Sequence, residues 1–182
     1  MHYVMTCEGP YPPTMIGTSP DVAGSPWNDG HPIEAPIDEP IVYALDPDYP
    51  GNMLALYDIA ELLIRDDLLA TLRRSGVDNL QVFRAIIEDP TTGSRHENYS
   101  AVNIVGVVAA ADMAESVPMT AGGMSLGGFD SLVVDETRAG DLLMFRLAEA
   151  VNAIVIHERV RTEIEAAGIP GITFWEPGEW SG

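Results

Sequence analysis

The sequence has 182 residues, enough for one domain with a substantial buried core. It carries 28 acidic residues against nine arginines and no lysine, so its formal net charge at pH 7 is −19. This charge argues against binding to nucleic acid or to anionic membrane surfaces, and it favours a basic partner. The single cysteine, Cys7, excludes an intrachain disulfide, and no apolar run approaches the ~20 residues of a membrane-spanning helix.

Residues 1–40 have the composition of an irregular segment. Ten of the 14 prolines fall within residues 1–50, and closely spaced prolines prevent long helices and central strands. Trp27 and the spacing of Ile33, Ile37 and Ile41 predict that this Pro- and acid-rich segment wraps over a core. A poorly ordered arm is the alternative. Because the first residues show neither a basic nor an apolar leader region, a cytoplasmic location is expected.

Residues 41–176 are expected to form the core of a single domain over 1–182, with residues 177–182 as a tail past the last regular element. Short strands are predicted at 41–45 and 62–64. Asp66 is expected to cap a helix that stops at Gly76, because glycine readily adopts the left-handed conformation found at helix ends.

A β-hairpin is predicted next along the chain. The apolar residues of 80–87 indicate a strand, and the sequence Asp89-Pro90-Thr91-Thr92-Gly93 is typical of a turn. The return strand is expected near 99–108. Further on, the glycines of residues 121–128 predict a flexible loop.

Two segments of the chain resemble each other at an offset of 92 residues. Residues 62–83 and 154–175 align without a gap, and each predicts a strand, a helix of about two and a half turns, a glycine stop and a second strand. Leu68 and Leu72 match Val160 and Ile164, which places one apolar stripe on each helix. We therefore predict an α+β fold with two strand–helix–strand units and a largely antiparallel sheet. Shared α/β pattern without an internal repeat is the alternative.

Catalytic motifs are weak in this sequence. Ser125 lies in Gly123-Met124-Ser125-Leu126-Gly127, but the strand before and the helix after a nucleophile elbow are not predicted there. Several carboxylates are adjacent, as in Asp38/Glu39 and Asp46/Asp48, and clustered carboxylates are what a small metal-dependent hydrolase would use. With 28 acidic residues such pairs arise by chance, so neither a metal ligand set nor a cofactor is predicted, and a non-enzymatic protein is expected.

The order of features from Leu62 onward resembles the immunity-protein family of type eleven from bacterial polymorphic toxin systems. The resemblance rests on a middle stretch, Tyr99-Ser100-Ala101-Val102-Asn103-Ile104-Val105-Gly106-Val107-Val108-Ala109-Ala110-Ala111-Asp112. It also rests on an ending that runs from Leu143-Met144-Phe145-Arg146-Leu147 through a strand and a helix to Gly168-Ile169-Pro170-Gly171. It covers roughly residues 40–176, with the Gly-rich stretch as a departure that leaves 116–130 unplaced.

The resemblance implies a non-enzymatic inhibitor that binds a cognate toxin protein and occludes it. A strongly acidic inhibitor would associate fast with a basic toxin domain, such as a nuclease. An acidic surface that serves solubility alone is the alternative. The predicted partner-binding residues belong to the arginine-free first part of the chain: Asp29, Glu34, Asp38, Glu39, Asp46 and Asp48. The other hypotheses are the metal-dependent hydrolase and a scaffold in which Trp175 and Trp180 form an oligomer contact.

Overall fold

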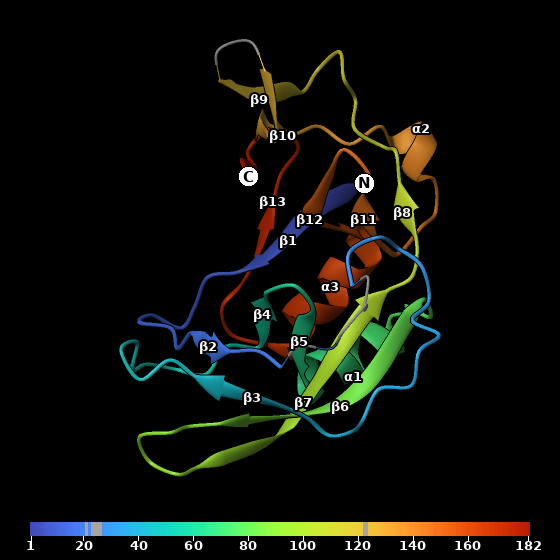
Figure 1. Ribbon diagram of the computed structural model, residues 1–182. Helices are drawn as coiled ribbons and strands as arrows, with labels where there is room; N and C mark the ends of the chain where they lie inside the picture. Colours follow the sequence, from blue (N-terminus) through green and yellow to red (C-terminus); the bar gives the residue numbers. More distant parts are fainter. Residues whose placement is uncertain (21, 23–26, 122–123) are drawn as a thin grey trace.

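The computed structural model describes residues 1–20, 22, 27–121 and 124–182, without the side chains of residues 121, 125 and 126. Two β-sheets lie above and below a pair of helices, α1 (Asp66–Arg74) and α3 (Glu158–Ala167) (Figure 1). We call them the upper sheet and the lower sheet, as they appear in Figure 1. With most strand pairs antiparallel and both helices packed against the sheets, the predicted α+β class is confirmed.

The upper sheet contains the first and the last strand of the described chain. Its strand order is β13 (Ile172–Trp175), β1 (His2–Cys7), β12 (Ala150–His157), β11 (Met144–Leu147) and β8 (Val107–Val108). The short β8 runs parallel to β11, and the other pairs among the described strands of this sheet are antiparallel. A separate hairpin of β9 (Val117–Ala121) and β10 (Met124–Ser131) lies beyond this sheet, and the short helix α2 (Glu136–Ala139) follows it.

The lower sheet is formed by the first part of the chain. Its order is β2 (Ile16–Thr18), β3 (Ile41–Leu45), β6 (Leu80–Glu88), β7 (Arg95–Ile104), β5 (Leu62–Arg65) and β4 (Leu56–Asp58). The strand predicted at 41–45 is β3, in which Ile41, Tyr43 and Leu45 are buried and alternate with more exposed residues. The hairpin prediction is confirmed, with β7 starting four residues earlier than expected, at Arg95.

The two segments that align at an offset of 92 have the same local topology. Helix α1 starts at residue 66 and α3 at 158, and the strands that follow start at 80 and 172, so both pairs of starts differ by 92. In each segment the strands before and after the helix lie on either side of one antiparallel strand, β7 in the lower sheet and β1 in the upper sheet. Each segment is therefore a split β-α-β unit. Their origin as an internal repeat stays a prediction.

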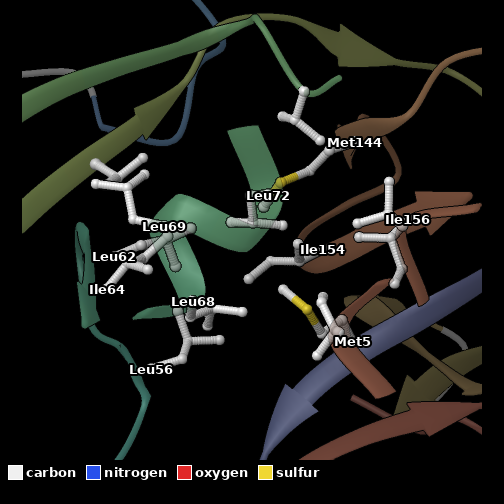
Figure 2. Close-up of a cluster of buried hydrophobic side chains, with 14 of the residues drawn as sticks. Met5, Leu56, Leu62, Ile64, Leu68, Leu69, Leu72, Met144, Ile154 and Ile156 are labelled. Atoms are coloured by element: carbon white, nitrogen blue, oxygen red, sulfur yellow. The ribbon is translucent and has the colours of Figure 1, made fainter. Parts of the chain in front are cut away.

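The main hydrophobic core lies where the two helices meet. Leu68, Leu69 and Leu72 of α1 pack in one buried cluster with residues of β11 and β12 (Figure 2). Val160 and Ile164 of α3 belong to the same cluster. These are the apolar stripes expected from the i, i+4 spacing, and they join the two sheets into one core.

The outer face of each sheet is also covered. Trp27 and Ile33 are buried with Tyr43 and Leu63 against the lower sheet, and the Trp27 ring contacts the edge of Phe83. These contacts support the predicted wrap, although residues 21 and 23–26 lie outside the described residues, so the wrap as a whole stays a prediction. On the upper sheet, Trp180 is buried with Phe129 and Phe145.

Two local expectations are corrected by the structure. The cap of α1 is Arg65 rather than Asp66, which is the first helical residue and adds favourable negative charge there. The predicted loop over 121–128 is largely the β9–β10 hairpin, with 122–123 outside the described residues. The tail of residues 177–182 packs on the domain: Trp180 is buried, and Trp180 and Gly182 form backbone hydrogen bonds with Leu132 and Phe129. The oligomer contact suggested for Trp175 and Trp180 stays a prediction.

Candidate interaction surface

The six predicted partner-binding acids follow the wrap and the two ends of β3. Five of them are exposed and Asp46 is half-buried. Asp38 and Glu39 lie just before β3, whereas Asp46 and Asp48 lie just after it, so the five residues of this strand separate the two pairs. The structure therefore spreads these acids along one margin of the lower sheet instead of gathering them in one cluster.

Several of these carboxylates are held in place by backbone groups. Asp29 accepts a hydrogen bond from the backbone N–H of His31 at 2.9 Å, and Asp46 accepts one from Asp48 at 2.9 Å. Glu39 accepts a hydrogen bond from the backbone N–H of Arg84 in β6. Such contacts restrict the carboxylates without neutralising them, because the donors are uncharged amides.

Two amide side chains tie the wrap to the lower sheet. Gln81 accepts a hydrogen bond from the Ile33 backbone N–H and donates one to the Ile33 carbonyl, both at 2.8 Å. Asn103, which faces Gln81 across the β6–β7 pair, donates to the His31 carbonyl at 2.9 Å. This geometry imitates the pairing of an additional strand, and it fixes the segment that carries Asp29 and Glu34.

We expect Gln81→Ala to loosen the wrap without unfolding the domain. The variant removes both hydrogen bonds to Ile33, each contributing about 1 kcal/mol, and a longer one that Gln81 accepts from the Asn103 side chain at 3.3 Å. Hydrogen exchange measured by NMR should show the Ile33 amide exchanging at least tenfold faster, while amides of β5 and β12 keep their rates. Arg84→Ala, an exposed side chain on the same strand, is the control and should leave the Ile33 amide unchanged. Equal exchange in both variants would show that Gln81 does not hold the wrap.

A cleft of 510 Å³, here called the acidic cleft, lies beside Asp46. It is bounded by the loop of residues 45–53 on one side and by the tip of the β6–β7 hairpin, residues 89–96, on the other. Asp46 and Asp89 both line it, and Tyr49 stands half exposed at its rim. The hydroxyl of Thr92, and then the backbone N–H of Thr91, lower the pKa of the Asp89 carboxyl, so it stays ionised at neutral pH.

A second hollow of 330 Å³, here called the apolar cavity, adjoins the first. It lies between the end of β1 and the strands β2 and β4, and its lining is mainly apolar, with Met5, Ile16 and Leu56 among its residues. Thr14 lines both hollows. Sequence reasoning identified Asp46 but missed Asp89 and the apolar cavity, since the Asp89–Gly93 signal indicates only a turn.

An ion pair between a buried arginine and a partly exposed aspartate connects the two sheets nearby. Arg146 of β11 is 1% exposed, and its guanidinium Nη2 lies 3.6 Å from the Oδ1 atom of Asp58 at the end of β4. Its Nη1 donates to the Val151 carbonyl at 2.6 Å. Burial raises the pKa of Asp58, and Arg146 partly opposes this effect. The arginine of the Phe145-Arg146-Leu147 motif is therefore held inside the protein, where it links β11 to β4.

The described residues give no support to a catalytic centre. Within the parts of the chain that the structure describes, no three His, Cys, Asp or Glu side chains lie close enough together to hold a metal ion. Ser125 lies inside strand β10, opposite Thr120, where no strand-to-helix turn follows it. No helix in the described ranges is both long and apolar enough to cross a bilayer.

Fold and surface together define an acidic α+β protein with a row of carboxylates along the lower sheet and two adjoining hollows. A comparison with protein families matches residues 35–179 to the immunity protein family Imm11. The chain belongs to this family, since the match covers most of its length, and this confirms the resemblance seen in the sequence. A comparison with curated proteins finds no match. Family membership makes the chain an immunity protein, whose partner is a toxin.

Proposed function

We propose that this protein acts in the cytoplasm as a non-enzymatic immunity protein that neutralises a basic toxin domain by covering it. The family match carries the immunity role. The charge distribution supports the basic partner, because the six predicted acids lie in a part of the chain without any arginine or lysine. A partner of opposite charge gains both association rate and selectivity from such a surface.

The arginines do little to offset this surface. Six of the nine form ion pairs with acids of the same chain: Arg65, Arg84, Arg95, Arg138, Arg146 and Arg161. Many of the 28 acids therefore remain available to attract a cation from outside. The exposed Asp38 and Asp48 are at the two ends of β3, so a single partner lying along this strand would meet both.

The first experiment is an affinity purification from the native lysate at low and high salt, followed by mass spectrometry. We expect one stoichiometric protein with a basic domain, released by high salt because screening weakens attraction between exposed charges. Expression of that domain alone should stop growth, and co-expression with this protein should restore it. A captured protein that is not toxic, or whose toxicity this protein does not relieve, would contradict the immunity role.

The contribution of the acids is tested with Asp38→Asn, Glu39→Gln, Asp46→Asn and Asp48→Asn combined. We expect association with the toxin to slow by about tenfold at low salt, with the difference shrinking at high salt. The matched control neutralises four exposed acids of the second half: Glu115, Asp130, Glu163 and Glu179. Equal slowing in both quadruple variants would show that net charge matters and that the predicted residues do not.

A further inference from the structure

We propose that a basic segment of the partner docks across residues 13–16, placing an arginine or lysine in the acidic cleft and a neighbouring apolar side chain in the apolar cavity. This inference rests on the proposed function. It specifies which part of the acidic surface receives the toxin, and that a charge contact and an apolar contact together hold it there.

The acidic cleft is suited to a cationic side chain. Its lining, all within the described residues, includes the carboxylates of Asp46 and Asp89 and the imidazole of His96, but neither arginine nor lysine. The Asp89 carboxylate is fixed in position because it accepts hydrogen bonds from the Thr91 backbone N–H at 2.8 Å and from the Thr92 hydroxyl at 2.7 Å. Asp46 is fixed by the backbone N–H of Asp48. A cation entering here meets two oriented negative charges, which lowers the cost of organising the site on binding.

The apolar cavity is suited to an uncharged anchor. The hydroxyl of Tyr57 lies next to it, and this group is already bonded to the Thr14 hydroxyl and to the Leu54 backbone N–H. Its volume of 330 Å³ is at the lower end of the range for ligand pockets, which fits one bulky side chain. Apolar pockets that take one such anchor contribute a large share of binding free energy at protein interfaces.

The chain between the two hollows is held rigid and carries exposed side chains of the types enriched in interfaces. Thr14 donates its backbone N–H to the Asn52 carbonyl at 3.0 Å, and Asp46 donates its own to the Met15 carbonyl at 2.8 Å. Tyr11 is 86% exposed, and Met15 and Tyr49 are about half exposed. Tyrosine and methionine are enriched in interfaces, and a tyrosine ring can also stack on a guanidinium.

The charge of the surroundings decides the occupant. Exposed apolar residues beside a hollow could receive any hydrophobic partner, but here they border a cleft with two carboxylates in a chain of net charge −19. An acidic segment would be repelled by these carboxylates, and a neutral segment would leave them without a counter-charge. A segment that alternates basic and apolar side chains satisfies both hollows together.

The test is an NMR titration of the isotope-labelled full chain with the peptide acetyl-Arg-Leu-Arg-amide. We expect saturable shifts confined to the residues that line the two hollows, in the ranges 5–7, 13–16, 45–59 and 89–96. Acetyl-Gln-Leu-Gln-amide should bind at least tenfold more weakly because it lacks the charges, and acetyl-Arg-Ala-Arg-amide several-fold more weakly because it lacks the apolar anchor. Asp46→Asn combined with Asp89→Asn, which removes both carboxylates of the acidic cleft, should weaken the first peptide about threefold to tenfold.

The control variant combines Glu115→Gln with Asp130→Asn, which removes the same charge from the region of the β9–β10 hairpin. It should leave peptide binding unchanged. Shifts spread over all acidic surfaces, or equal weakening by both double variants, would overturn the docking site. The titration does not depend on the toxin, so a negative result together with growth rescue refutes the docking site alone. Localised peptide binding without any toxin partner would refute the proposed function and leave the site as a peptide-binding surface.

Discussion

Replacement of Asp58 by alanine is expected to cost about 3 kcal/mol of the free energy of unfolding. The change leaves the Arg146 guanidinium buried without its carboxylate, and breaking a buried pair typically costs about 3–5 kcal/mol. The lower end of this range applies because the Asp58 side chain is 38% exposed, so water screens part of the interaction. Urea denaturation monitored by tryptophan fluorescence measures the loss as a shift of the midpoint.

A second substitution separates the lost charge pair from lost packing. Arg146→Met in the Asp58→Ala background removes the unpaired charge while keeping an extended side chain in the same space, so most of the lost stability should return. Asp130→Asn, an exposed acid of the upper part of the molecule, should change the free energy by less than about 0.5 kcal/mol. If Asp58→Ala is no more destabilising than this control, the ion pair does not stabilise the junction of the sheets.

Truncation of Leu72 to alanine is the other large effect, with an expected loss of about 2–5 kcal/mol. Leu72 is fully buried in the cluster that joins α1 with α3, and its removal leaves a cavity between the two sheets. Leu72→Met keeps most of the volume and should cost less than about 1.5 kcal/mol. The same denaturation experiment measures both variants.

The similarity between residues 62–83 and 154–175 predicts the same effect at a second position. Ile164 occupies the position of Leu72 in the second β-α-β unit, 92 residues further along, and it is 1% exposed. Ile164→Ala should therefore cost about the same as Leu72→Ala. A loss below 1 kcal/mol at one of the two positions would show that the units do not share the helix contact equally.

Local sequence signals predicted the regular elements well where one face of the element is buried. The alternation in 41–45 and the i, i+4 leucines of 66–74 identify β3 and α1 because each pattern matches the period of its secondary structure. The same logic failed at residues 121–128. Glycine favours loops locally, but pairing with β9 supplies backbone hydrogen bonds that make β10 a strand despite its glycines.

The negative charge of the surface was predictable from the sequence, but the positions of its carboxylates relative to one another were not. The sequence alone shows an anionic first part of the chain, and its motifs identified the family later confirmed over residues 35–179. It could not show that Asp46 and Asp89, which are 43 positions apart, face each other across a cleft, because the loop after β3 and the β6–β7 hairpin meet only in the folded chain.

By itself the sequence determined the charge, the elements that bury one face, the two similar units and the family, since all of these depend on composition or on neighbours within one segment. Only the tertiary structure decided that β1 and β7 complete the two units, that Trp180 is buried, and that Arg146 pairs with Asp58. These features depend on residues far apart in the chain, and their partners are chosen by the packing of two sheets on a shared pair of helices.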